Sequence, residues 1–246
     1  MNFRASQNCF ILLILLLSGL SFAKHPVPKK AAITIIFIHT ANGKAIVLND
    51  SSYHNVYGES YTIKKMKYYI SNVKLNGKKI KFAEKESYHL INVAGTTSFT
   101  FDIDPGEYDK LQFMIGVDSS RNFSGAQTGS LDPLNDMFWT WNNGYVTFKL
   151  EGTSPQSPAD LNRIEHHIGG YRSPYQTASG IRFSLKLINI KSNSTHTITI
   201  KCNLDEYWKA VNENKIANMP VNTVPGAAAR KAAENISQMF SLMSID

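Results

Sequence analysis

The sequence predicts an all-β fold, an antiparallel β-sandwich with an amphipathic helix at its C-terminal end. Most segments after residue 30 alternate apolar and polar residues with a period of two, as strands with one buried face do. Turn-forming sequences such as Asn76-Gly77 and Asp104-Pro105-Gly106 separate these segments. The spacing changes to that of a helix only near the C-terminus. Many strands joined by such turns are typical of a sandwich.

The N-terminus has the features of a secretory signal peptide, residues 1–23. Arg4 precedes an apolar run from Phe10 to Leu20, and Ser21-Phe22-Ala23 places small residues two apart. An uncleaved membrane anchor is the alternative, but the run is shorter than the roughly 20 apolar residues that span a bilayer. We expect cleavage after Ala23, an exported protein that is periplasmic or secreted, no membrane insertion, and a single domain over residues 24–246.

Composition limits the classes of site. Cys9 would be removed with the signal, so Cys202 is left without an internal disulfide partner and cannot build a thiolate cluster. A hydrophobic content of 43% is enough for a core without such bonds. The formal net charge is +7, but the lysines are spread along strands and turns and form no nucleic-acid-binding motif. We expect a solvated basic face and no nucleic-acid partner.

The segment Ile33 to Thr40 shows the strand pattern most clearly, with His39 at the end of an apolar face that starts at Ile33. Tyr61 to Leu75 and Lys79 to Phe82 should form a hairpin around Asn76-Gly77. Further strands are expected over Ser87 to Val93, Thr97 to Ile103, Leu111 to Val117, Tyr145 to Glu151, Ile181 to Ile190 and Thr195 to Cys202. The last two should pair through the turn at Ser192 to Ser194.

Two segments depart from this pattern. Asp118 to Trp141 is a long connection with an aromatic end, and long ordered loops are usually functional. In the tail, Asp205 to Asn212 could form one short helix, and residues 227–243 form the amphipathic helix that closes the domain. The apolar stripe of that helix consists of Ala229, Ala232, Ala233, Ile236, Met239 and Phe240.

Histidines are the residues that most suggest chemistry. His39 and His89 stand on apolar strand faces, and the pair His166-His167 precedes Gly169-Gly170. Imidazole is the commonest ligand for borderline metals, and strands far apart in sequence can meet at one end of a sandwich. The alternative for each histidine is a hydrogen-bonded structural role. We therefore treat these histidines as candidate metal ligands.

Other residues give weaker evidence for a functional site. Trp139 and Trp141 would face the same way in an extended segment, either as part of a site or as core packing. Asp118, Asp132 and Asp136 lack the spacing of an EF-hand calcium loop. The sequence contains no nucleophile elbow, phosphate loop or HExxH motif. We therefore do not expect an enzyme.

Several blocks of sequence resemble the MbnP-like copper-binding family, over about residues 33 to 240. The two most specific are Tyr69-Ile70-Ser71-Asn72, preceded by a second tyrosine, and Met137-Phe138-Trp139-Thr140-Trp141. Matching residues also occur at 36–39, 88–90, 115–118, 129–133, 142–145, 149–152 and 167–170.

The resemblance implies an exported protein that binds copper through His39, His89 and His167, with no counterpart for His166. It also implies a partner dihaem enzyme, similar to cytochrome c peroxidases, that oxidises tryptophan to kynurenine in relatives. Trp139 and Trp141 would be the possible oxidation targets or packing partners. Asp118 or Glu151 could orient the imidazoles from the outer shell.

Three functions follow, in this order of preference. The first is copper binding for uptake, storage or delivery, which requires the three histidines to converge. The second is an extracellular binding or adhesion module without metal, which predicts exposed tryptophans and scattered histidines. The third is an enzyme such as a copper-dependent oxidase, for which the sequence offers no separate acid–base set.

Overall fold

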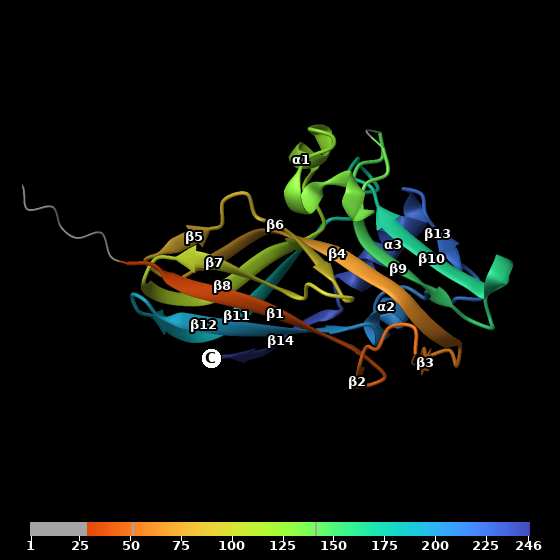
Figure 1. Ribbon diagram of the computed structural model, residues 1–246, viewed down its shortest axis with the longest axis horizontal. Helices are drawn as coiled ribbons and strands as arrows, with labels where there is room; N and C mark the ends of the chain where they lie inside the picture. The colour runs from red at the N-terminus through yellow and green to blue at the C-terminus, as the bar shows by residue number, and fades with distance from the viewer. Residues whose placement is uncertain (1–28, 51, 141) are drawn as a thin grey trace, which may run out of the picture.

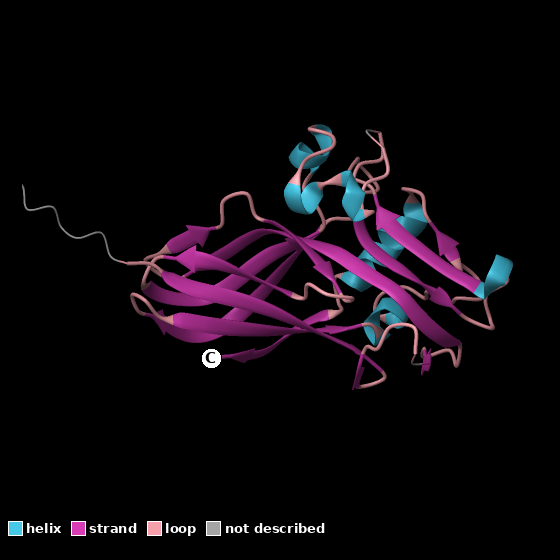
Figure 2. Ribbon diagram, viewed as in Figure 1, coloured by secondary structure: helices cyan, strands magenta, loops and turns pink. Residues whose placement is uncertain are grey.

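The computed structural model describes residues 29–50, 52–140 and 142–246; the expected signal peptide lies outside these ranges. Within them, two β-sheets pack face to face, and strands dominate over helices (Figure 2). The expected all-β sandwich is therefore confirmed. Its core forms because every second residue along a strand is apolar and points between the sheets, as Ile33, Ile35 and Phe37 do in β1.

The first sheet has the order β14-β12-β1-β2 in the described part of the chain, and β7 pairs with β1 on the side away from β12. Its strands are β1 (Ala31–Ala41), β2 (Lys44–Ala45), β7 (Ser98–Ile103), β12 (Thr195–Asn203) and β14 (Phe240–Ile245).

The second sheet has the order β11-β8-β4-β9-β10-β13 among the described residues, with β3, β5 and β6 paired to the long strand β4. As Figure 1 shows, β4 runs through most of the length of the molecule and connects its two halves. The strands are β3 (Ser52–His54), β4 (Ser60–Asn76), β5 (Lys81–Ala83), β6 (Tyr88–Asn92), β8 (Gly106–Ile115), β9 (Val146–Thr153), β10 (Arg163–Gly169), β11 (Ser179–Ile190) and β13 (Val221–Asn222).

The pairing of strands differs from the prediction in two respects. The sheets are mixed, because β1 runs parallel to β12 and β10 runs parallel to β13. No hairpin joins these partners, so nothing forces them to be antiparallel. The expected pairing of β11 with β12 is wrong: β11 pairs with β8 and β12 with β1, so the turn between them crosses from one sheet to the other.

The helices are short. They are α1 (Ser119–Phe123), α2 (Asp205–Lys209) and α3 (Ala227–Ile236), with 3₁₀ turns η1 (Gly129–Leu131), η2 (Pro133–Asn135) and η3 (Asp160–Asn162). The amphipathic helix ends at Ile236, earlier than expected, and the chain then forms β14. Met239 and Phe240 are still buried, because they follow the helix into the same core. No helix in the described ranges is both long and apolar enough to cross a membrane.

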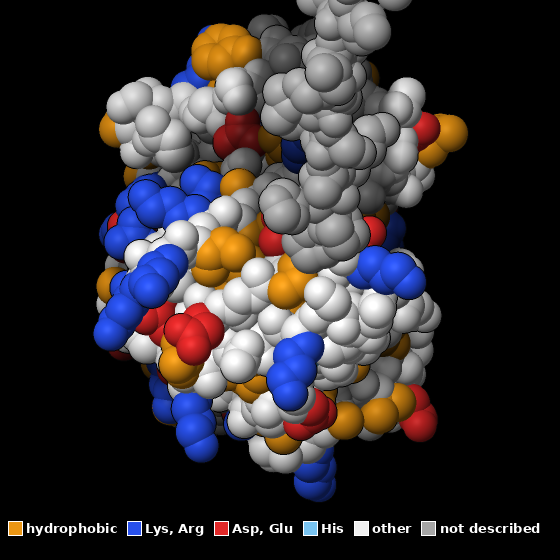
Figure 3. Space-filling model, turned by 90° about the vertical axis from the view of Figure 1, so that its left-hand side faces the viewer, with side chains coloured by type: hydrophobic (Ala, Val, Ile, Leu, Met, Phe, Trp, Pro, Cys, Tyr) orange, Lys and Arg blue, Asp and Glu red, His pale blue; other side chains and the backbone are white. Residues whose placement is uncertain are grey.

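The basic side chains do not form one continuous surface on the end of the molecule seen in Figure 3. Lysine and arginine side chains alternate there with acidic, apolar and uncharged ones. Two of the exposed lysines already face an acidic side chain, Lys30 at 3.7 Å from Asp104 and Lys110 at 3.9 Å from Asp109. The absence of a nucleic-acid partner stays a prediction.

Candidate metal centre

A cluster of charged side chains lies on the outer face of the second sheet, where β4, β9 and β10 run side by side. On β9, Phe148 and Leu150 belong to the hydrophobic core, so the alternation of the strand turns Lys149 and Glu151 to the opposite face. The register pairs Lys149 with His167 on β10, which therefore shares this outer face. We call these three residues, with Lys65, Asp136 and Glu165, the outer-face cluster.

Ion pairs hold the outer-face cluster together. Lys149 Nζ lies 2.9 Å from Asp136 Oδ1, and Lys65 Nζ lies 2.9 Å from Asp136 Oδ2 and 3.2 Å from Glu151 Oε2. The side chain of Lys149 is only 4% exposed, so its charge depends on these carboxylates. Burial alone would raise the pKa of Asp136, but the hydrogen bonds from Lys149 and Lys65 outweigh it and lower the pKa to about 2. The carboxylate of Asp136 is thus ionised and held in place between the two lysines.

His167 is held from one side only. Its Nε2 donates to Glu151 Oε1 at 2.9 Å, and Glu165 Oε1 lies 3.9 Å from the same nitrogen. Burial raises the pKa of Glu151, but hydrogen bonds from His167 and Lys65 outweigh it and hold the pKa below its usual value. The other ring nitrogen, Nδ1, has no hydrogen-bond partner among the described residues. A carboxylate that fixes the proton on one nitrogen and frees the other is typical of metal-binding histidines.

Trp139 packs next to this part of β10. A Cβ added at Gly169, two residues after His167, would come within 2.7 Å of Cζ3 of Trp139 and 2.9 Å of the carbonyl oxygen of Tyr145. Glycine is therefore what lets the indole lie against the strand. The backbone N–H of Trp139 donates to the carbonyl of Gly144 at 3.0 Å, which anchors the segment. Of the expected site residues, the structure groups His167, Glu151 and Trp139 in one region.

Replacing Gly169 by alanine should displace Trp139 and cost about 1–3 kcal/mol of stability, because the new methyl group overlaps both a ring and a backbone oxygen. Tryptophan fluorescence and urea unfolding would measure the two effects. Gly180→Ala is the matched control, since a Cβ there meets nothing within 4 Å. An unchanged fluorescence spectrum and unfolding midpoint in Gly169→Ala would contradict the close packing described above.

His39 lies on the other side of the second sheet, between the two sheets. Its Nε2 is 2.8 Å from the hydroxyl of Tyr68, a core residue, and its strand neighbour in β12 is Cys202. Burial lowers the pKa of His39 to about 4, so the imidazole is neutral near pH 7. A neutral imidazole can act as a ligand, but this one faces the core and not His167.

His89 sits at the margin of the space between the sheets. Its ring stacks on Phe99 of β7 with centroids 3.6 Å apart, and its Nε2 lies 2.8 Å from Glu84 Oε2. Like His167, it has a carboxylate on Nε2 and no hydrogen-bond partner for Nδ1 in the described part of the chain. Its stacking on the first sheet places it apart from the outer-face cluster.

The three predicted ligands do not converge. No group of three His, Cys, Asp or Glu side chains within the described ranges could hold one metal ion. His166, the fourth candidate, is fully buried, with Nδ1 2.6 Å from the Tyr207 hydroxyl and Nε2 2.8 Å from the carbonyl of Met219. His166 is therefore a hydrogen-bonded structural histidine and not a candidate ligand. The roles of His39, His89 and His167 as ligands stay predictions for each residue separately.

Comparisons with known proteins identify the relatives of this fold. The family model described as MbnP matches residues 30–225. The chain belongs to the MbnP family. Its structure is also similar to a solved structure, MbnP from Methylosinus trichosporium, with a TM-score of 0.62 and 13% sequence identity. The match covers 87% of this chain and 98% of that one, and at this identity it shows the fold alone. A search of curated proteins found no match.

In this member of the MbnP family, Asp118 lies away from the outer-face cluster. Asp118 caps α1, with Oδ1 accepting from the backbone of Arg121 at 3.0 Å, and its Oδ2 accepts hydrogen bonds from Tyr88 and Asn72. It orients these groups and not an imidazole. Trp141 lies outside the described residues. Glu151 alone has the expected contact with a candidate histidine.

Sequence reasoning missed Lys149, Glu165 and Asp136 as parts of the cluster. The period of two does contain a signal for Lys149, which stands two residues before Glu151 and therefore on the same face. Glu165 stands two residues before His167 in the same way. Asp136 directly follows η2, and no local pattern connects it to β9. The sequence suggests for Asp136 only the role of a calcium ligand, which its two lysine partners oppose.

Proposed function

We propose that this protein is an exported copper-binding protein that takes up, stores or delivers copper, and that it is not an enzyme. The observation that supports this best is the state of His167. Its Nε2 is bound to an ionised carboxylate, its Nδ1 is free of hydrogen bonds within the described part of the chain, and Trp139 packs beside its strand. Membership of the MbnP family is consistent with this proposal.

The outer-face cluster supplies one ligand of the kind that copper prefers, but not a complete set of three from His, Cys, Asp or Glu among the described residues. His167 offers the nitrogen Nδ1, while Glu151 and Glu165 lie on the side of Nε2. Copper(II) stands at the top of the affinity order of divalent metals, so this imidazole, completed by nitrogen and oxygen ligands from a modified Trp139, can favour it. Lys65 and Lys149 oppose a cation, but the two carboxylates of Asp136 and Glu151 together offset their two charges. Copper, when bound, would supply a positive centre that these donors neutralise.

Trp139 is the residue that a partner enzyme would modify under this proposal. Its side chain is only half-buried and belongs to the outer side of the second sheet. A dihaem peroxidase-like partner that oxidises Trp139 to kynurenine would create an aniline nitrogen and a ketone next to His167. Mass spectrometry of protein from the native host would detect this change as a tryptophan that has gained oxygen and lost carbon.

Copper titration of protein exported by its native host should give about one copper per chain. His167→Ala should abolish most of this binding, and Glu151→Gln should weaken it by about 10- to 100-fold, because the carboxylate orients the ring. Single His39→Ala and His89→Ala variants measure whether those histidines contribute, and the triple variant with His167→Ala should bind no copper.

His196→Ala is the matched control, since His196 contacts Ser194 and the backbone of Asp246 at the other end of β12. Copper retained at full affinity in the triple variant would disprove the ligand assignment. No copper in folded wild-type protein would disprove the function and leave the adhesion module as the better explanation.

A further inference from the structure

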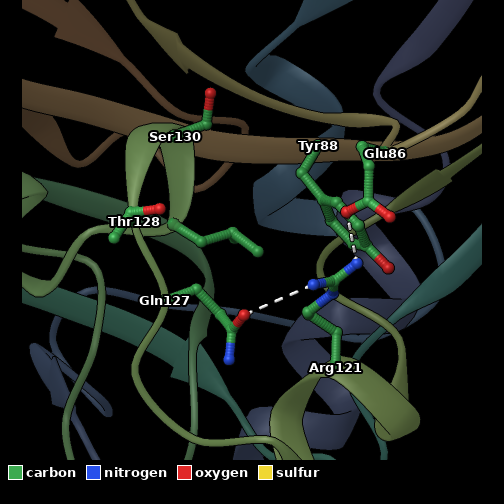
Figure 4. A pocket seen from close by; sticks show the side chains of 7 residues that line it. Glu86, Tyr88, Arg121, Gln127, Thr128 and Ser130 are labelled. Atoms are coloured by element: carbon green, nitrogen blue, oxygen red, sulfur yellow. Dashed lines mark hydrogen bonds and ion pairs between the residues drawn. The ribbon is translucent and has the colours of Figure 1, made fainter.

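A polar pocket of about 230 Å³ opens between the start of β6 and the segment from α1 to η1. None of its lining residues belongs to the outer-face cluster. Figure 4 shows the arrangement: Arg121, Tyr88 and Glu86 form one wall, and Thr128 and Ser130 stand on the other, with Gln127 below. The proposed function uses none of these side chains.

Arg121 is held so that its guanidinium points into this pocket. It lies 4.8 Å from the centroid of the Tyr88 ring, with Nη2 2.6 Å from Glu86 Oε2 and Nη1 3.3 Å from Gln127 Oε1. The hydrogen bond from Tyr88 to Asp118 fixes the ring beneath it. A guanidinium has five N–H donors; the hydrogen bonds to Glu86 and Gln127 use two of them, and the Tyr88 side chain interacts with a further part of the group. The remaining donors can bind an anion in the pocket.

Glu86 supplies the opposite charge at the rim. Its side chain is 79% exposed, and its backbone adopts a left-handed conformation with φ of 45°. Residues other than glycine adopt this conformation rarely, so the contact with Arg121 is made at some cost in backbone energy. An exposed ion pair contributes little free energy, so an exposed carboxylate can exchange one cationic partner for another at little cost. Glu86 can therefore turn from Arg121 to a ligand ammonium group.

The facing wall offers neutral hydrogen-bond donors. The hydroxyl groups of Thr128 and Ser130 have no hydrogen-bond partner among the described residues, and both line the pocket opposite Arg121. A carboxylate between the two walls could accept from the guanidinium and from the Thr128 hydroxyl, and also from Ser130 after a rotation of its hydroxyl, which points away from Arg121 in Figure 4. Guanidinium and carboxylate form strong, directional hydrogen bonds.

We infer that this pocket binds a small zwitterion, a free α-amino acid with a short side chain, with its carboxylate on Arg121 and its ammonium group on Glu86. The balance of charges selects this class. A dianion such as phosphate would be repelled by Glu86, and a simple cation by Arg121. The volume is below the range of sites for drug-sized ligands, which limits the occupant to a small molecule.

The test is an NMR titration of the isotope-labelled chain with L-alanine, acetate, methylammonium and inorganic phosphate. Alanine should shift the amide signals of Arg121, Thr128 and Ser130 in a saturable way. Acetate and methylammonium should each bind about tenfold more weakly, because each lacks one of the two charged contacts. Arg121→Gln should lose alanine binding, and Glu86→Gln should bind alanine and acetate with equal affinity.

Arg182→Gln is the matched control, since Arg182 is exposed on β11 and lines no part of this pocket. Glu86→Gln changes an exposed residue, so its folding is not in question even if Arg121→Gln destabilises α1. Non-saturable shifts, tighter binding of phosphate than of alanine, or unchanged alanine binding in Glu86→Gln would each overturn the inference. Copper binding by the same variants is independent of these outcomes.

Discussion

Acidification of the metal-free protein from near pH 6.5 to about pH 4 should destabilise it by about 3 kcal/mol for each of two buried histidines, His39 and His166. Burial lowers the pKa of each imidazole from 6.5 to about 4. Between these values the unfolded chain binds a proton at each histidine and the folded chain does not. Stability is therefore full above pH 6.5 and is lost as the pH falls towards 4.

The hydrogen bonds of His166 explain why its neutral form is required. The carbonyl of Met219 can only accept, so Nε2 carries the proton and Nδ1 accepts from the Tyr207 hydroxyl. A second proton would place a charge in the core and turn Nδ1 into a donor facing that hydroxyl. His39 has the hydroxyl of Tyr68 as its partner in the same core.

Urea unfolding at a series of pH values would measure this effect, with imidazole NMR signals reporting the two pKa values. Asp118 and Asp136, whose pKa values are lowered to about 2, lose their contribution only below this window. A free energy of unfolding that stays flat between pH 6.5 and 4 would show that the histidines titrate normally.

Trp208→Ala should destabilise the protein by about 3–5 kcal/mol, the range for removing a large aromatic side chain from a core. Trp208, on α2, is fully buried, and its ring lies 5.0 Å from that of Tyr61 and 5.1 Å from that of Tyr207. The cavity left by the indole would lie where α2 packs on the second sheet. For a chain of this size the melting temperature should fall by about 10 °C.

Trp139→Ala is the control for this prediction. Because the Trp139 ring is only half-buried, Trp139→Ala should lower the free energy of unfolding by only about 1–2 kcal/mol. It should nevertheless reduce copper binding more than Trp208→Ala does. Thermal and urea unfolding of both variants would separate the structural tryptophan from the one beside the cluster. Equal losses of stability in the two variants would contradict this division.

The sequence predicted those elements whose signals are local. The alternation from Ile33 predicted β1, and the turn at Asn76-Gly77 predicted the hairpin of β4 and β5. The spacing of apolar residues from Ala229 predicted α3. It did not predict which strands pair, because a period of two specifies a face and not a partner. The separation of β11 and β12 and the parallel pairing of β1 are decided by packing between distant segments.

The candidate site shows the same limit. His39 was a candidate ligand at the end of an apolar strand face, and His167 was one beside a glycine pair, in a segment expected to be a turn and found to be the strand β10. The sequence could not show that the two imidazoles lie on opposite sides of one sheet. Glu151, one of the two carboxylates named as able to orient an imidazole, does contact His167, whereas the lysines that share this carboxylate were not expected. Side chains from loops, such as Asp136, enter a site through the tertiary path of the chain, which local patterns do not encode.

The pairing of β1 with β12 has a consequence for how the molecule folds. These neighbours are joined by more than half of the chain, from Ala41 to Thr195, and β14 adds to the same sheet from the last residues. Contacts between distant segments require large loops to close first, and proteins rich in them fold slowly. The first sheet cannot be completed until the whole polypeptide is present, so refolding should be slow, with the β4–β5 hairpin forming well before β1 gains both of its neighbours.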